Sequence, residues 1–265
     1  MKRATEQLPS TDSYKCVTVI QARRGSSRLP DKILMPLAGV TVLERVIQRC
    51  KAIQGVDKVV CAIPDDEYND PVEQLAIAAG ASVCRGSEDD VLSRYVDAVI
   101  DIDTKYVMRV TADCPFLDPE VCQDLLEGVE QNAVEYGGTA HWPHGLDCEV
   151  FNKDLLLQAG KEATHAHDRE HVTLWMKRHC ETRNFICRPD KDYFHEHRWV
   201  LDYPEDLAFL ERLVSLIPSY PEIVGWREVL EAVNADPALK TLNHGRIAEW
   251  REKTNQIIEE AGRNA

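Results

Sequence analysis

Between residues 16 and about 130, short apolar segments alternate with amphipathic segments of helical period. The apolar segments have the length and composition of buried strands, at 16–20, 56–63, 82–84 and 106–110. The amphipathic segments are expected to be helices, at 41–52, 71–79, 89–100 and 118–130. Strands that alternate with helices predict βαβ crossovers. We therefore expect an α/β fold with a Rossmann-like, mainly parallel sheet flanked by helices.

The rest of the chain follows this pattern less regularly. Turns are expected at Gly137-Gly138, Pro143 and Gly145, and the remaining predicted elements are short strands at 148–151, 185–187 and 199–202 and helices at 168–180 and from about 204 to about 216. Residues 218–265 look helical, with a break at 236–237. We therefore divide the chain into a disordered tail (1–15), a main domain (16–217) with an irregular α+β subregion (138–200), and a C-terminal helical extension (218–265).

Composition excludes several classes of protein. The net charge of −14 argues against a nucleic-acid partner, because phosphate backbones require a basic surface. No apolar run approaches the roughly 20 residues of a membrane helix, and the first fifteen residues lack the apolar core of a signal peptide. The nine cysteines are scattered and form no C-x-x-C pair, which is typical of a reducing compartment. We expect a cytoplasmic protein.

A basic loop follows the first predicted strand. Residues 21–32 read Gln-Ala-Arg-Arg-Gly-Ser-Ser-Arg-Leu-Pro-Asp-Lys, which gathers positive charge at one strand end of an acidic chain. Gly25 and the two serines allow backbone N–H groups to approach an anion closely, while the arginines and lysine supply compensating charge. The loop therefore predicts a polyphosphate site.

Two carboxylates also stand just past predicted strands. Asp113 and Asp202 each follow an apolar segment, and ligands of parallel sheets bind outside the carboxyl ends of the strands. Facing the basic loop, such carboxylates suit Mg²⁺ held together with substrate phosphates. The alternative for each aspartate is the N-cap of the helix that follows. Their occurrence together with the loop favours the metal site.

A collinear series of motifs runs from about residue 16 to 215. It includes the loop at 21–32, Leu-Glu-Arg-Val at 43–46, Arg-Gly-Ser-Glu-Asp-Asp-Val-Leu-Ser-Arg-Tyr at 85–95, Thr-Ala-Asp-Cys-Pro at 111–115, Asp-Pro at 118–119, His-Gly-Leu-Asp-Cys-Glu-Val-Phe at 144–151, Arg-Glu-His-Val at 169–172 and Arg-Trp-Val-Leu-Asp-Tyr-Pro-Glu-Asp-Leu at 198–207. In these segments the chain resembles the spore coat polysaccharide biosynthesis protein F-type cytidylyltransferases. That family belongs with the acylneuraminate and 3-deoxy-manno-octulosonate cytidylyltransferases.

The resemblance implies transfer of CMP from CTP to a small acidic or phosphorylated acceptor for surface polysaccharide synthesis. The catalytic residues implied are Arg28, Lys32 and Asp113, and the Mg²⁺ ligands are Asp113 and Asp202. The nucleotide-binding residues implied are Gln21, Ala22, Arg23, Gly25, Ser26, Arg28, Lys32, Arg85, Gly86 and Ser87. Two positions depart from the family: Asp31 and Ala112 stand where it usually has glycine. Asp31 adds a negative charge beside Lys32.

The acceptor site implied by the resemblance consists of Asp147, Arg169, Glu170 and His171, and the family also implies a homodimer formed through 138–200. Two alternatives for the histidines of this region remain: a zinc site using His167 and His171, four residues apart, or a solvated or interface surface. Since an anionic acceptor needs no strong general base, the lack of an obvious base motif is consistent with this reaction.

Two other functions remain as alternatives. A glycosyltransferase of similar fold would consume a nucleotide sugar, and Asp101-Ile-Asp103 has the D-x-D form of metal-dependent members of that class, although a solvated turn is the simpler role there. A catalytically silent nucleotide-binding protein is the other alternative. The presence of Arg28, Lys32 and the two strand-end aspartates argues against it.

Overall fold

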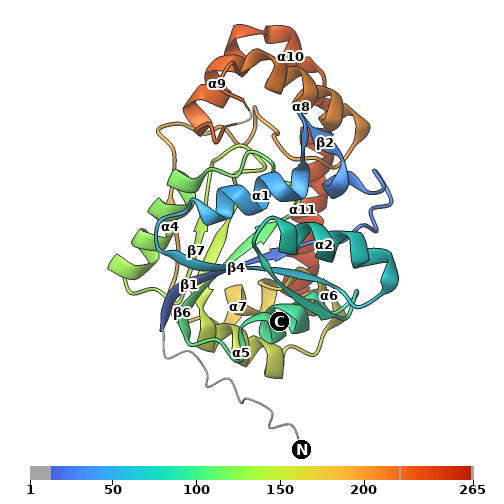
Figure 1. The fold of residues 1–265 in the computed structure, drawn as a ribbon. Coiled ribbons are helices and arrows are strands. Elements are labelled where there is room, and N and C mark those ends of the chain that lie inside the picture. Colours follow the sequence, from blue (N-terminus) through green and yellow to red (C-terminus); the bar gives the residue numbers. More distant parts are fainter. Residues whose placement is uncertain (1–12, 221, 264–265) are drawn as a thin grey trace, which may run out of the picture.

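A seven-stranded sheet forms the centre of the computed structural model, which describes residues 13–220 and 222–263 (Figure 1). The strand order is β5-β4-β1-β6-β8-β7-β9. All neighbouring strands run parallel except β8, which is antiparallel to β6 and β7. The bounds are β1 Tyr14–Gln21, β4 Val56–Pro64, β5 Ser82–Gly86, β6 Thr104–Thr111, β7 Tyr136–Thr139, β8 Glu149–Asn152 and β9 Arg183–Cys187. The predicted mainly parallel α/β sheet is confirmed.

Helices cover both faces of the sheet. One face packs against α1 (Val42–Lys51), α2 (Asp70–Ala78), α4 (Pro119–Gln131), α8 (Pro204–Leu216) and α9 (Trp226–Ala235), and the other against α3 (Val91–Val99), α5 (Lys153–Glu162) and α7 (Leu174–His179). Side chains along β1 alternate between the two faces: Cys16 and Ile20 face the first group of helices, and Val17 and Val19 face the second. The smaller elements are two 3-10 helices (Lys32–Leu34, Glu67–Asn69), β2 (Pro36–Leu37), β3 (Val40–Thr41), α6 (Ala166–His171), α10 (Pro237–Thr241) and α11 (Gly245–Arg263).

The N-terminal half agrees closely with the sequence prediction. All four predicted strands and all four predicted helices form, with ends shifted by a few residues. The strands predicted at 148–151 and 185–187 form as β8 and β9. Since β1 begins at Tyr14, the predicted tail is two residues too long, and residues 1–12 of that tail lie outside the described residues.

The strand predicted at 199–202 is wrong. The segment is extended, but its backbone bonds to loops: Trp199 N–H donates to the His144 carbonyl (2.7 Å) and Leu201 N–H to the Asp113 carbonyl (2.9 Å). Among the described residues, the only bridge to other extended backbone is that between His144 and Arg198, just before the segment. The segment crosses the carboxyl edge of the sheet, where its apolar residues are buried without a strand partner.

Two further predictions are corrected. The helix predicted at 168–180 is broken into α6 and α7 at Val172, whose φ is 60°; its apolar residues keep helical spacing, so periodicity does not reveal the break. Gly137-Gly138, predicted as a turn, lies within β7. There a Cβ at Gly137 would lie 2.3 Å from a Val129 methyl group, so the glycine permits α4 to pack closely on the strand.

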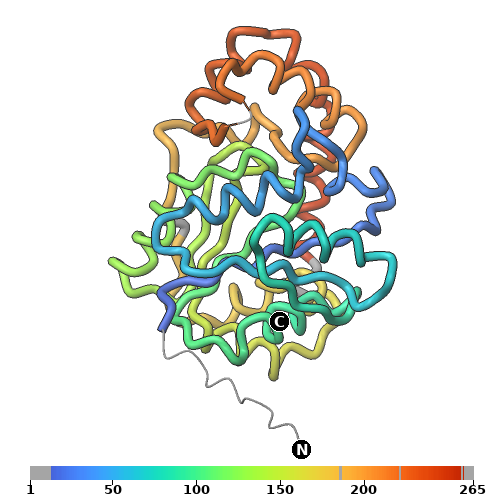
Figure 2. The backbone as a smooth tube through the Cα atoms, viewed as in Figure 1, coloured from blue at the N-terminus to red at the C-terminus, as the bar shows by residue number. Residues whose placement is uncertain are grey.

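The C-terminal extension returns to the sheet edge. Beyond α10 the chain turns into α11, which runs from the helices at one end of the molecule back toward α6 (Figure 2). The Trp250 ring stacks on His144 with a centroid distance of 3.9 Å, and the Ile257 carbonyl lies 3.2 Å from His167 Nε2. All nine cysteines are free, and no helix among the described residues is long and apolar enough to span a bilayer.

Candidate active site

The Lys32 ammonium lies between two carboxylates at the carboxyl edge of the sheet. Its Nζ is 2.5 Å from Asp113 Oδ2 and 2.5 Å from Asp202 Oδ1. The loop after β1 supplies the lysine, the end of β6 supplies Asp113, and the edge segment supplies Asp202. The Leu201–Asp113 backbone bond holds the last two segments side by side. Lys32 is 9% exposed, and the two neighbouring charges raise the pKa of its ammonium despite burial.

Asp202 contacts more cationic side chains than Asp113 does. Besides Lys32, its carboxylate contacts Arg28 at 3.0 Å and Arg198 at 3.2 Å. Burial alone would raise the pKa of Asp202, but these charges outweigh it and hold that pKa well below its usual range. The helix after it is capped instead by Asp206, which accepts from the backbone N–H groups of Asp202 and Tyr203. The N-cap alternative for Asp202 is therefore wrong.

These side chains line a cleft that holds most of the predicted residues. A cavity of about 650 Å³ is bordered by Gln21, Arg23, Gly25, Ser26, Arg28, Lys32, Asp113, Glu170, His171 and Asp202 among others. A second cavity, of about 530 Å³, shares four of these residues (Gln21, Arg23, Glu170 and His171) and adds Ala22. The two cavities thus adjoin along one wall. Residues drawn from both halves of the sequence converge there, as the strand-end argument predicts.

Asp31, the departure from the family glycine, has a backbone explanation. Its φ is 58°, a left-handed conformation that glycine and aspartate tolerate better than other residues. Its carboxylate accepts from Arg24 Nε at 2.7 Å and from the Tyr68 hydroxyl at 3.3 Å. The negative charge beside Lys32 is therefore compensated by Arg24, which the loop directs away from the cleft.

Some predicted residues lie elsewhere. The Arg85 guanidinium pairs with Asp70 at 2.6 Å and Glu73 at 2.5 Å on α2. Arg169 donates to Asp90 at 2.7 Å and to the Ala163 carbonyl at 2.8 Å. Asp147, whose side chain is 44% exposed, accepts from Gly145 N–H, and its partial burial raises its pKa to about 6. None of these three, nor Gly86 or Ser87, lines the described walls of the two adjoining cavities, and their predicted roles stay predictions.

The structure adds residues that the sequence did not single out. His144, Arg198 and Trp250 line the larger of the two cavities. His144 Nδ1 is 2.8 Å from Arg198 Nη1, so that nitrogen accepts a hydrogen bond. Burial, followed by the charge of Arg198, lowers the pKa of His144 to about 3, and the ring is therefore neutral. His144 and Arg198 lie in quoted motifs, whereas Trp250 carries no sequence signal.

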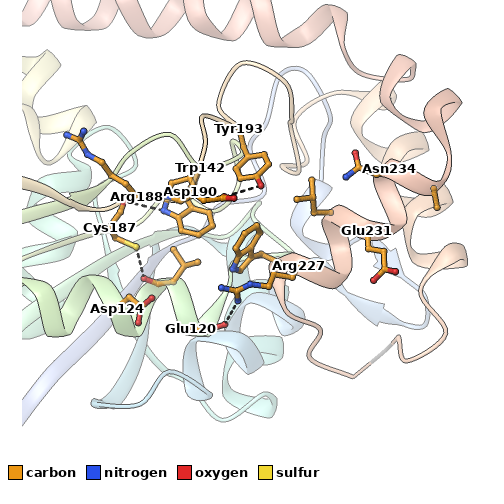
Figure 3. A pocket seen from close by; sticks show the side chains of 15 residues that line it. Glu120, Asp124, Trp142, Cys187, Arg188, Asp190, Tyr193, Arg227, Glu231 and Asn234 are labelled. Carbon is orange, nitrogen blue, oxygen red and sulfur yellow. Dashed lines mark hydrogen bonds and ion pairs between the residues drawn. The ribbon is translucent and has the colours of Figure 1, made fainter.

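A groove larger than either of these two cavities lies elsewhere on the molecule. This groove, of about 1020 Å³, lies between α4, the segment after β9 and α9 (Figure 3). Trp142, Tyr193 and Trp226 form its aromatic floor, and the Arg227–Glu120 pair closes one side. None of the predicted site residues lines the described part of this groove. Size alone would point to this groove, whereas the gathering of cations and carboxylates points to the cleft.

Two alternatives lose their structural basis. His167 and His171 are ring neighbours at 4.5 Å, but no group of three or more His, Cys, Asp or Glu side chains in the described part of the chain could hold a metal ion, so a zinc site finds no third ligand there. Asp101 and Asp103 are exposed and precede β6, at the edge of the sheet opposite Asp113. The D-x-D pair is therefore a solvated turn.

Comparisons with known proteins show the family of the chain. A family model described as cytidylyltransferase matches residues 17–235. Spore coat polysaccharide biosynthesis protein SpsF of Bacillus subtilis (strain 168) is 30% identical over 230 residues, covering 84% of this chain and 95% of that protein. The 8-amino-3,8-dideoxy-manno-octulosonate cytidylyltransferase of Shewanella frigidimarina (strain NCIMB 400) is 30% identical, covering 87% of each chain.

Solved structures give the same answer for the fold. A cytidylyltransferase from Leptospira borgpetersenii superposes with a TM-score of 0.78 at 26% identity, covering 85% of this chain and 96% of the other. The family match extends over most of the sheet and includes every cation and carboxylate of the cleft that was predicted from sequence. The chain belongs to the cytidylyltransferase family and is a CTP-dependent nucleotidyltransferase.

Proposed function

We propose that the chain transfers CMP from CTP to a small anionic acceptor, with Mg²⁺, and releases pyrophosphate. The observation that carries this proposal is the convergence of Arg28 and Lys32 with Asp113 and Asp202 in the cleft. One relative is named as a spore coat polysaccharide biosynthesis protein, and another as a cytidylyltransferase of a sugar acid. Both names support a precursor of a surface polysaccharide as the acceptor.

The donor set suits a hard divalent cation. Asp113 Oδ2 and Asp202 Oδ1 both contact the Lys32 ammonium, so the two carboxylates lie close enough together to share one cation. Carboxylate oxygens are the ligands that Mg²⁺ prefers. Asp113 and Asp202 would hold the ion. When bound, it supplies positive charge to the phosphoryl oxygens. Asp113 has room for this role, because beyond Lys32 its carboxylate meets only the Cys114 thiol, at 3.7 Å, among the described residues.

The loop residues stabilise the leaving group. The acceptor oxygen forms a bond to the α-phosphorus of CTP, the bond from that phosphorus to the bridging oxygen breaks, and pyrophosphate leaves with the electron pair. Charge develops on phosphoryl oxygens, so fixed cations supply most of the catalysis. Arg28 and Lys32 neutralise the pyrophosphate, and Arg23 with the 25–26 backbone orients the triphosphate. A phosphate acceptor attacks as an anion, whereas a sugar hydroxyl loses its proton to water as the bond forms.

The acceptor side of the cleft is the wall formed by α6 and α11. Glu170 and His171 come from α6, and Trp250 and Lys253 come from α11. We place the acceptor between this wall and Asp113, with its anionic group toward Lys253.

A pyrophosphate-release assay tests the proposal. Purified protein is incubated with Mg²⁺, one of the four ribonucleoside triphosphates and panels of sugar acids, sugar phosphates and neutral sugars. We expect release with CTP and an anionic acceptor, and its loss with EDTA. Release of a nucleoside diphosphate from a nucleotide sugar would instead establish a glycosyltransferase, and tight CTP binding with no product across the panel would favour a silent nucleotide-binding protein.

We also propose a homodimer formed through 138–200. The edge strand β9 pairs only with β7 among the described residues, and the aromatic groove of Figure 3 lies beside it. A second copy that covers this edge would bury Trp142, Tyr193 and Trp226 further. Light scattering should give twice the chain mass of 30.1 kDa, and a monomer at micromolar concentration would contradict the proposal.

A further inference from the structure

One buried arginine beside the cleft has a guanidinium without a hydrogen-bond or ion-pair partner among the described residues. Among the described residues, the arginines that are at most 2% exposed are Arg45, Arg49, Arg94 and Arg198. Arg49 donates to two backbone carbonyls, Arg198 pairs with Asp202 and Asp206, and Arg45 lies over the Tyr220 ring. The Arg94 guanidinium makes no hydrogen bond or ion pair with any described residue, and its Nε and Nη1 are fully buried.

The Arg94 side chain lines the 530 Å³ cavity. Other residues lining it are Gln21 and Arg23 of the phosphate loop and the acidic Glu88 and Asp89, and Glu88 lies 3.6 Å from Arg23. A Cβ at Gly86 would lie 2.8 Å from the Arg94 Cγ, so the absence of a side chain there lets the arginine stem lie against the end of β5. Burial lowers the pKa of the guanidinium. A buried guanidinium without an acceptor is costly, which indicates that a ligand brings the acceptors.

The position of this cavity indicates which part of the nucleotide it receives. It adjoins the triphosphate cleft along Gln21 and Arg23. A nucleotide whose phosphates lie in the cleft places its base in the next cavity. Cytosine offers two adjacent acceptors, N3 and O2, and an exocyclic amine that donates. A guanidinium fork matches two adjacent acceptors, and the carboxylates of Glu88 and Asp89 can accept from the amine.

We propose that Arg94 is the residue that selects cytosine, by donating to its N3 and O2 atoms. Uracil carries a hydrogen on N3, so its N3–H would face an N–H of the guanidinium and neither group could accept. The same arginine therefore rejects UTP. The inference rests on the proposed use of CTP. It assigns base selection to a residue of α3 and separates that task from phosphate binding by the loop.

Replacing Arg94 with Met tests the assignment. The ratio of kcat/KM for CTP to that for UTP should fall about 10- to 100-fold, the discrimination expected of a bidentate pair. Affinity for tripolyphosphate, which has no base, should stay within about twofold of wild type in a thermal-shift titration. Arg94→Lys keeps the charge but loses the fork, and most of the selectivity should be lost with it.

Wild-type enzyme gives an independent measurement should the variant fail to fold. The triphosphate of 3-deazacytidine lacks the N3 acceptor and should be used at least tenfold less well than CTP. In Arg94→Met this penalty should disappear. Arg49→Met is the matched control, because Arg49 is also buried but lies on α1 and lines neither cavity; it should lower stability and leave the CTP:UTP ratio unchanged.

Equal use of CTP and its 3-deaza analogue by wild type, or an unchanged CTP:UTP ratio in Arg94→Met, would overturn the assignment. Failure of wild type to release pyrophosphate from CTP at all would instead refute the proposed function.

Discussion

Two charged clusters lie on the same sheet, and they differ in how fully their carboxylates are bonded. Glu149 on β8 accepts from Arg109 at 2.7 Å, Tyr136 at 2.5 Å and Lys177 at 2.6 Å, with Thr173 at 3.1 Å from one oxygen and 3.2 Å from the other. Asp113, just past the end of the adjacent strand β6, accepts from the Lys32 ammonium at 2.5 Å, with a thiol at 3.7 Å. Both clusters are largely buried, yet only Asp113 opens onto the 650 Å³ cleft.

The difference separates a structural cluster from a reactive one. The lone pairs of Glu149 are occupied, so the cluster around it fixes β6, β7 and α7 together and has no capacity for a ligand. Asp113 keeps lone pairs free beside a shared cation, which is what a metal–phosphate site requires. The two clusters are alike in burial and in the proximity of their charges. They differ in whether the carboxylate still has free lone pairs.

The largest effect is expected at the reactive cluster. Asp113→Ala removes a carboxylate with free lone pairs, so turnover with CTP should fall about 10³-fold or more. Stability should change little, because Lys32 keeps its contact with Asp202. Pyrophosphate release and urea denaturation measure the two quantities. Asp101→Ala, at the opposite edge, is the control and should retain full activity; equal losses in both variants would break the comparison.

The structural cluster should respond in the opposite way. Glu149→Gln leaves Arg109 and Lys177 uncompensated and should lower the free energy of unfolding by about 3 kcal/mol. Burial opposes ionisation, but Lys177 and Arg109 hold the pKa of Glu149 far below its usual 4.5. Its stabilisation is therefore complete above that value and is lost as pH falls below it.

Urea denaturation at several pH values checks the Glu149 prediction. The difference between wild type and Glu149→Gln should be largest at neutral pH and shrink below about pH 4.5. A difference that is constant with pH would show that the carboxylate charge is not what stabilises the cluster.

A smaller effect is expected where α11 covers the site. Trp250→Ala removes the ring stacked on His144, and aromatic pairs of this kind contribute about 0.5–1.5 kcal/mol, so kcat/KM should fall about 2- to 10-fold. Water would then reach the imidazole, and the pKa of His144 should rise from about 3 toward its usual 6.5. NMR titration of the histidines measures this shift. An unchanged pKa would mean that Arg198 alone keeps the ring neutral.

The smallest effect concerns Asp147. Its pKa is raised to about 6, so the folded state disfavours the charged form and stability falls as pH rises from about 4 to above 6. Asp147→Asn should remove this slope and give a slightly higher melting temperature than wild type at pH 7.5 but not at pH 4. A variant that melts lower at both pH values would indicate that the carboxylate makes a favourable contact when charged.

Much of the fold and half of the site could be predicted from the sequence. The first four strands and helices follow from hydrophobic period, and Lys32 and Asp113 follow from their places just past strands. Arg85 and Arg169 show the limit. Their motifs point to ligand binding, but the structure turns both guanidinium groups toward carboxylates of α2 and of the α3 N-cap. Direction of a long side chain depends on which partner lies nearby, and a motif does not contain that information.

By itself, the sequence determined the parallel sheet and the basic loop, because period and local charge are written in consecutive residues, and its resemblance to a family implied the reaction class. Only the tertiary structure decided which carboxylate is saturated, which arginine is unpartnered, and that α11 closes the cleft with Trp250. The physical reason is that these properties belong to contacts between distant segments, as between Lys32 and Asp202 or between His144 and Trp250.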